Sequence, residues 1–326
     1  MLCINDHHTD PYFNLAAEEY VLKNFADNCF MLWRNGPSVI VGRHQNTLAE
    51  INMDYVKQNH IKVVRRLSGG GAVFHDLGNL NFTFIEHANN DRLIDFQKYT
   101  QPIIAVLRSL DVDARFEGRN DLMIEGRKFS GNAEHVFRDR VLHHGTLLFA
   151  SELADLSGAL NANPAKFTDK AIKSVRSRVT NISHHLKKPL DLEEFRDRIL
   201  CYMMDNYTDC EPYNYTDNDI TAISKLRDEK YATWDWNFGQ SPGYNMVNSL
   251  RTGGGNLELH LDVQNGVIRH IRIFGDFFNI ADIAELEQLL TGMPHNETSI
   301  RQRLGKINLS GYLLNVTTDE LVRCLI

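Results

Sequence analysis

The chain is poor in cysteine, and its cysteines do not occur at metal-binding or redox spacing. There are five among 326 residues, an odd number scattered along the sequence, and no CxxC motif occurs. This excludes a zinc knuckle or a dithiol redox motif, and it predicts reduced thiols in a cytoplasmic protein. The five are Cys3, Cys29, Cys201, Cys210 and Cys324.

The sequence also lacks a targeting segment, a long apolar run and an excess of positive charge. Its beginning, MLCINDHHTDPYFNL, contains no basic stretch followed by an apolar one, and no later run approaches a membrane span in length. With 35 Lys and Arg against 42 Asp and Glu, the net charge of −7 gives no general attraction to nucleic acid or acidic membranes. We therefore expect no nucleic-acid or membrane partner, and any anion site must be a local arrangement.

Strand and helix patterns do alternate along most of the chain. Apolar runs bounded by turn residues predict a hairpin that turns at Glu125-Gly126 and strands at 30–33, 38–42, 61–64, 72–74, 80–85 and 140–150. Helical periodicity predicts helices from about Asn14, as the N-cap, to Phe25 and from Tyr99 to Leu110. His75 and Asn79 are interpreted as turn-forming residues, and residues 152–230 are expected to be mostly helical.

A second domain is expected after the segment WDWNFGQSPGYN at 234–245, where glycine, proline and aromatic residues interrupt the pattern. Beyond it, NLELHLDV and VIRHIRIF flank Gln264-Asn265-Gly266, which predicts a β-hairpin followed by a helix. We therefore divide the chain into domains 1–245 and 246–326, the second a small α+β unit. The glycines at 253–255 are expected to form a turn that enters this hairpin.

The most unusual stretch is RRLSGGGAVFHDLGNLNFTF at 65–84, where three glycines follow two arginines and precede a strand. Glycine adopts positive φ at little cost, so successive backbone N–H groups can converge on an anionic oxygen. Arg66 lies three residues before Gly69, near enough to share that anion. The stretch is neither a Walker A loop nor a dinucleotide fingerprint. On its residues alone, it is equally compatible with a strand connection beside solvated arginines.

This stretch resembles the signature of the lipoate–protein ligases, and further segments resemble that family in the same order along the chain. They are DPYFNLAAEEY (10–20), VGRHQN (41–46), GRNDLMIEGRKFSGNA (118–133), VLHHGTLLF (141–149), KSVRSRVTNI (173–182) and WDWNFGQSPGYN. The resemblance implies an α+β fold in which helices flank a mixed β-sheet, as in the catalytic domain of biotin and lipoate protein ligases. It also implies a small α+β C-terminal accessory domain.

The resemblance implies the site residues as well. Arg66 and Lys128 match the catalytic arginine and lysine, although by spacing alone Lys128 is also compatible with a solvent-facing residue beside a turn. Asp121 either contacts the nucleotide or caps the hairpin. Nucleotide binding is implied for Arg66, Gly69, Gly70, Gly71, Ala72, Val73, Phe74, Asp121 and Lys128, and lipoate binding for Lys128, His144 and Thr146. His144 and Thr146 are equally compatible with an ordinary core strand, and no metal ligands are assigned.

The implied reaction uses ATP with Mg²⁺ to activate lipoic acid as lipoyl-AMP, and then lipoylates a lysine of a carrier domain. The carriers implied are acyltransferase subunits of 2-oxoacid dehydrogenases and the glycine-cleavage carrier protein. A carboxylate that attacks the α-phosphate brings two anions together, and Arg66, Lys128 and the glycine amides would stabilise that charge.

Two alternatives stay open: a lipoyl or octanoyl transferase of the same superfamily, and a non-catalytic lipoate- or nucleotide-binding protein. A cysteine-dependent transferase is disfavoured because none of the five cysteines lies in the glycine, RKFSG or HHGT motifs. Arg176 and Arg178 are either an anion-binding or carrier-docking stretch or an exposed helix face. The sequence does not separate lipoate from octanoate.

Overall fold

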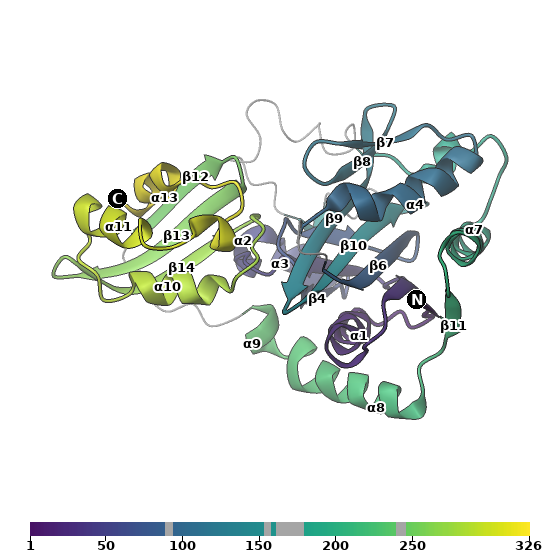
Figure 1. Ribbon diagram of the computed structural model, residues 1–326, viewed down its shortest axis with the longest axis horizontal. Helices are drawn as coiled ribbons and strands as arrows, with labels where there is room; N and C mark the ends of the chain where they lie inside the picture. The colour runs from purple at the N-terminus through teal and green to yellow at the C-terminus, as the bar shows by residue number, and fades with distance from the viewer. Residues whose placement is uncertain (89–93, 153–157, 161–178, 239–245) are drawn as a thin grey trace.

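The computed structural model describes residues 1–88, 94–152, 158–160, 179–238 and 246–326. Figure 1 shows two bodies, a larger one built around a long sheet and a smaller yellow-green one formed by the C-terminal residues. Each has a buried apolar core of its own. The predicted class, a mixed sheet flanked by helices with a small α+β C-terminal part, is confirmed.

An eight-stranded mixed sheet forms the larger body, in the order β11-β1-β2-β6-β10-β9-β8-β7. Its strands are β1 (Leu2–Asn5), β2 (Cys29–Trp33), β6 (Asn79–His87), β7 (Ala114–Glu117), β8 (Asp121–Ile124), β9 (Arg127–Phe137), β10 (Arg140–Leu148) and β11 (Glu211–Tyr213). The strands β11, β1 and β2 are mutually parallel, and the others pair antiparallel. A smaller sheet has the order β4-β3-β5, with β3 (Ser38–Val41), β4 (Lys62–Arg65) and β5 (Val73–His75).

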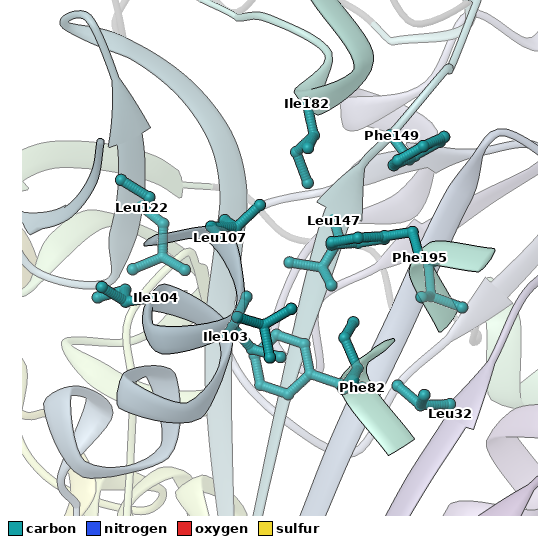
Figure 2. Packing of buried hydrophobic residues seen from close by; sticks show 14 of the residues in the cluster. Leu32, Phe82, Ile103, Ile104, Leu107, Leu122, Leu147, Phe149, Ile182 and Phe195 are labelled. Atoms are coloured by element: carbon teal, nitrogen blue, oxygen red, sulfur yellow. The ribbon is translucent and has the colours of Figure 1, made fainter. Parts of the chain in front are cut away.

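Helices cover both faces of the large sheet. The helices of the larger body are α1 (Pro11–Asn24), α2 (Thr47–Glu50), α3 (Met53–Gln58), α4 (Phe96–Ser109), η2 (Ile182–His185), α7 (Leu192–Asn206), α8 (Asp217–Leu226), η3 (Arg227–Tyr231) and α9 (Trp234–Asn237). Of these, α3 packs against the smaller sheet. In β2, Phe30 and Leu32 face the core under α4 and α7, while Met31 and Trp33 face the core under α1. Because both faces are buried, the strand reads as an unbroken apolar run. Figure 2 shows the face where α4 packs against Phe82 and Leu147.

Helix α1 begins three residues before the position predicted for its N-cap. Asp10 is the N-cap, and its side chain accepts a hydrogen bond from the backbone N–H of Tyr12. Pro11 occupies the first turn, where its fixed φ favours helix and its missing N–H costs nothing. The prediction that Asn14 caps the helix is therefore wrong. The side chain of Asn14 is instead buried and hydrogen-bonded to neighbouring segments.

The C-terminal body packs helices against a three-stranded antiparallel sheet, β12-β13-β14. Its elements are β12 (Met246–Thr252), β13 (Gly255–Gln264), β14 (Val267–Gly275), α10 (Ile283–Leu290), α11 (Glu297–Leu304), α12 (Leu309–Tyr312) and α13 (Thr318–Leu325). The predicted hairpin turn is confirmed, since Asn265 and Gly266 both have positive φ between β13 and β14. The turn that precedes β13 is also confirmed, and β12 is an additional strand before it.

Two expectations need correction or lie outside the described residues. Cys3 on β1 and Cys210 next to β11 form a disulfide, so the prediction of reduced thiols is wrong for this pair, which lies 207 residues apart in sequence. The other three cysteines are free thiols.

Arg176 and Arg178 belong to residues 161–178, outside the described part of the chain. No helix among the described residues is both long and apolar enough to cross a bilayer.

Candidate active site

A cavity of about 280 Å³ lies where the glycine stretch, the β8–β9 hairpin and β10 meet. The predicted site residues that line it are Arg66, Gly70, Gly71, Ala72, Val73, Asp121, Lys128, His144 and Thr146. Gly69 and Phe74 do not line it. A β-carbon at Gly69 would lie 2.2 Å from the carbonyl oxygen of Phe277, and Phe74 is buried in the core beside β3.

Arg66 holds the glycine loop in shape. Its Nη2 donates to the carbonyl oxygens of Gly69 at 2.6 Å and Gly71 at 2.9 Å, and its Nη1 donates to Ile40 at 3.2 Å. Its Nε donates to Ser68 Oγ at 3.0 Å. An arginine has five N–H donors, so one Nη1–H still has no acceptor among the described residues. Burial lowers the pKa of Arg66 to about 10, which leaves the guanidinium charged at neutral pH.

The three glycines have different surroundings. Gly70 has φ of +90°, and its N–H donates to the carbonyl oxygen of Phe277 at 3.4 Å. A β-carbon at Gly70 would approach Arg66 Nη2 to 2.9 Å, whereas one at Gly71 would meet no heavy atom within 4 Å. The loop therefore contacts the C-terminal body at Gly69 and Gly70 and the open cavity at Gly71.

Lys128 and Asp121 form an ion pair at the mouth of the cavity. Lys128 Nζ lies 2.7 Å from Asp121 Oδ1, and the two side chains are 37% and 36% exposed. The tight β8–β9 hairpin places them together, because Lys128 pairs with Met123 only two residues from Asp121. Lys128 is therefore an accessible cation held beside the glycine loop.

His144 is the centre of a buried hydrogen-bonded chain. Its Nε2 lies 2.6 Å from Ser68 Oγ, and its Nδ1 lies 2.9 Å from Glu18 Oε1 on α1. Glu18 Oε1 is an acceptor, so His144 Nδ1–H donates to it. Ser68 Oγ accepts from Arg66 and still has its own hydroxyl proton, which it donates to His144 Nε2. Thr83 also donates to Glu18 at 2.6 Å. The chain links helix α1 to Arg66 and fixes its orientation.

The inner end of the cavity is formed by residues that were not predicted to belong to the site. They are Leu15, Trp33, Ile40, His75 and Asn81. The interpretation of His75 as a turn residue is wrong, since it ends strand β5 and its ring is buried. The alternation along β2 would have placed Trp33 on the α1 face, but nothing local indicates that this face opens into a cavity.

The C-terminal body closes one side of the mouth with the segment 275–279. Gly275 N–H donates to the carbonyl oxygen of His44 at 2.8 Å, and the His44 ring stacks on Phe277 with centroids 4.8 Å apart. Arg119, beside the hairpin, donates to the carbonyl oxygen of Gly254 and lies over the Phe278 ring. Asp276 itself lines the cavity.

Other hollows and clusters carry fewer of the predicted residues. A larger cavity of about 680 Å³ lies by β7 and the turn of the β8–β9 hairpin, and none of the predicted site residues lines it. Within the described residues, no group of three or more His, Cys, Asp and Glu side chains is arranged to hold a metal ion. The predicted residues are therefore concentrated in the smaller cavity, which has Lys128 at its exposed end and Leu15, Trp33 and Ile40 in its interior.

Comparison with known proteins gives a consistent result over the whole chain. Residues 10–204 match the family described as lipoyl protein ligase A/B catalytic domain, and residues 241–325 match the bacterial lipoate protein ligase C-terminus. Lipoate–protein ligase 1 of Staphylococcus aureus is 44% identical, with 98% of each chain covered.

Two solved structures are also similar. The P. falciparum LipL1 structure in complex with lipoate has a TM-score of 0.82 at 26% identity, over 99% of this chain and 97% of that one. A lipoate-protein ligase A structure bound with ATP has a TM-score of 0.64 at 27% identity, over 73% of this chain and 99% of that one. With its sequence, its fold and the order of its motifs in agreement, this chain belongs to the lipoate–protein ligase family.

Proposed function

We propose that this chain is an ATP-dependent lipoate–protein ligase, which activates lipoate as lipoyl-AMP and transfers the lipoyl group to a lysine of a carrier domain. The observation that carries the proposal is the cavity itself. Arg66 and Lys128 both line it, Lys128 at the exposed end, and an apolar wall that includes Leu15 and Trp33 forms its interior. An acid with a nonpolar tail and a reactive carboxylate fits that polarity.

In the first step, a carboxylate oxygen of lipoate attacks the α-phosphorus of ATP, the bond to the β-phosphate oxygen breaks, and pyrophosphate leaves. Lys128 would release Asp121 and bridge the carboxylate and the α-phosphate. The remaining Nη1–H of Arg66 and the N–H groups of the loop would donate to phosphate oxygens. Donors that are already in place stabilise the transition state without reorganising, which is worth on the order of 10²–10³ in rate for each.

In the second step, the neutral amine of the carrier lysine attacks the carbonyl carbon of lipoyl-AMP. An amide bond forms, the mixed anhydride opens, AMP leaves, and the amine gives up a proton. Lys128 would stabilise the negative charge on the carbonyl oxygen. His144 and Thr146 would line the passage of the acyl chain beside this carbonyl.

The cysteines argue against a transferase that uses a thiol nucleophile. None of the five lines the cavity. Cys3 is held in a disulfide, and burial raises the pKa of Cys29 to about 12, which leaves it a poor nucleophile. A ligase needs no such nucleophile, because ATP supplies the activated leaving group.

Further parts of the proposal concern the metal, the partners and the domains. Mg²⁺ would arrive with ATP and neutralise the triphosphate, near the carboxylates of Asp121 and Asp276.

The carriers would be dehydrogenase acyltransferase subunits or the glycine-cleavage carrier, and the protein would work in the cytoplasm. We also propose a catalytic domain 1–245 and an accessory domain 246–326, with roles for Gly69 and Phe74 in shaping the nucleotide loop.

The test measures both half-reactions. Purified protein is mixed with ATP, Mg²⁺ and lipoate, and pyrophosphate release is followed with and without an apo carrier domain, whose mass is then measured. Pyrophosphate release that depends on lipoate, together with one lipoyl addition to the carrier, is the expected result. Transfer from an acyl-carrier thioester without ATP would favour the transferase, and binding without turnover would favour a sensor.

A further inference from the structure

Two buried N–H donors stand unpaired at the inner end of the cavity. His75 on β5 and Asn81 on β6 both line the cavity, and both side chains are at least nine-tenths buried. His75 Nε2 and Asn81 Nδ2 have no hydrogen-bond partner among the residues that the structure describes. A buried donor without an acceptor costs free energy, so such groups usually mark a site for something that accepts.

The hydrogen bonds behind His75 show which of its nitrogens carries the proton. Asn14 Nδ2 donates to two backbone carbonyls, which fixes the orientation of that amide. The same nitrogen shares one of its two hydrogens with Asn35 Oδ1 at 3.0 Å, so Asn35 turns its Nδ2 toward His75 Nδ1 at 3.1 Å. Nδ1 is therefore an acceptor, and the ring proton sits on Nε2. Burial lowers the pKa of His75 to about 3, so the ring stays neutral at pH 7.

The exposure of the lining residues shows which end of the cavity is open and which end is buried. Lys128 and Asp121 are each more than a third exposed, whereas Trp33, His75 and Asn81 are at most 3% exposed. If a carboxylate is held at Lys128, the other end of the acid lies among these buried side chains. His75 lies close to Trp33, with ring centroids 6.3 Å apart. The inner end is thus an aromatic and aliphatic pocket that also holds N–H donors.

We propose that His75 and Asn81 recognise the distal end of the acid by donating to its sulfur atoms, so that the site selects a dithiolane over a plain hydrocarbon tail. This inference rests on the proposed function. A sulfur atom is a weak hydrogen-bond acceptor, whereas a methylene group accepts no hydrogen bond. A hydrocarbon tail would therefore leave both donors unpaired. Sites built to hydrogen-bond a substrate group reject analogues that lack it. Because sulfur accepts weakly, we expect a preference of about tenfold in kcat/KM, equivalent to ~1.4 kcal/mol.

The first test uses the unaltered protein and three acids. Lipoate is compared with 5-cyclopentylpentanoate, which keeps the chain length and the five-membered ring but replaces both sulfurs with methylenes, and with octanoate. ATP-dependent pyrophosphate release is measured for each. We expect kcat/KM to be about tenfold lower for the cyclopentyl acid than for lipoate. Equal use of these two acids would overturn the inference, whereas no release with any acid would instead refute the ligase function.

The second test uses His75→Phe, which keeps an aromatic ring and removes the donor. The ratio of kcat/KM for lipoate to that for the cyclopentyl acid is expected to fall several-fold. Ile40→Val, in the same cavity wall but without a polar atom, should change both acids equally and leave the ratio as it was. An unchanged ratio in a folded His75→Phe protein would overturn the inference, and the series of acids decides the question if that variant does not fold.

Discussion

Replacing Lys128 should remove activity while leaving the fold almost intact. Its ion pair with Asp121 joins side chains that are each more than a third exposed. Water and salt screen such a pair, so its loss costs about 0–1 kcal/mol of unfolding free energy. Loss of a placed donor to the transition state should lower the rate of pyrophosphate release by on the order of 10²–10³. Lys128→Ala should therefore lose most of its activity while keeping nearly all of its stability.

Lys62 offers a matched control elsewhere on the surface. Its Nζ pairs with Asp10 at 2.9 Å, and the two side chains are 47% and 32% exposed, close to the values for the Lys128 pair. Lys62 does not line the cavity. Lys62→Ala should thus show the same small stability loss and keep its rate.

The assay combines urea unfolding with lipoate-dependent pyrophosphate release for the two variants and the unaltered protein. Normal turnover in Lys128→Ala would refute its role. An equal loss of turnover in Lys62→Ala would show that the effect is one of stability or net charge. A large stability loss confined to Lys128→Ala would mean that the ion pair supports the hairpin itself.

Two further predictions concern stability. Gly70→Ala should cost about 1–3 kcal/mol in urea unfolding, because its φ of +90° disfavours any side chain and the new methyl would crowd Arg66 Nη2. The free energy of unfolding of Gly71→Ala should stay within about 0.5 kcal/mol of that of the unaltered protein, since its β-carbon would meet no heavy atom within 4 Å. Equal losses in the two variants would contradict this reasoning. Burial raises the pKa of Glu134 from 4.5 to about 8, so between these values the folded chain keeps a proton that the unfolded chain has released. Stability should then fall as pH rises, by at most ~1.4 kcal/mol per pH unit, and urea unfolding of Glu134→Gln near pH 5 and near pH 8 should show a flatter dependence. Parallel pH profiles for the two proteins would refute the assignment.

The strands were the part of the fold that the sequence predicted best. Runs such as 30–33 and 80–85 lie within β2 and β6, because β-branched and aromatic residues between turn residues have few other stable arrangements. The start of α1 was placed three residues late, because the prediction relied on Asn14 and overlooked Asp10 with Pro11. Caps depend on one local hydrogen bond, so neighbouring candidates compete closely.

The site was predicted through motifs, and its supporting residues were not. Arg66, Lys128 and His144 belong to recognisable stretches, and the fold brings all three to one cavity. Glu18 contacts His144 across 126 residues of sequence, and no local pattern reveals that pairing. The same holds for the C-terminal segment at the mouth, whose main-chain carbonyl at Phe277 contacts the loop and carries no side-chain signature.

The contact between the glycine stretch and Phe277 limits which C-terminal parts can be exchanged between relatives. A larger body from a relative with any side chain at residue 69 would not accept this C-terminal body, because the β-carbon would lie 2.2 Å from the carbonyl oxygen of Phe277. Gly69 is required by the contact with the C-terminal body, Gly70 is required by its positive φ, and Gly71 borders the open cavity. Three identical neighbouring residues thus meet three different structural requirements, and a hybrid protein would test only the requirement at Gly69.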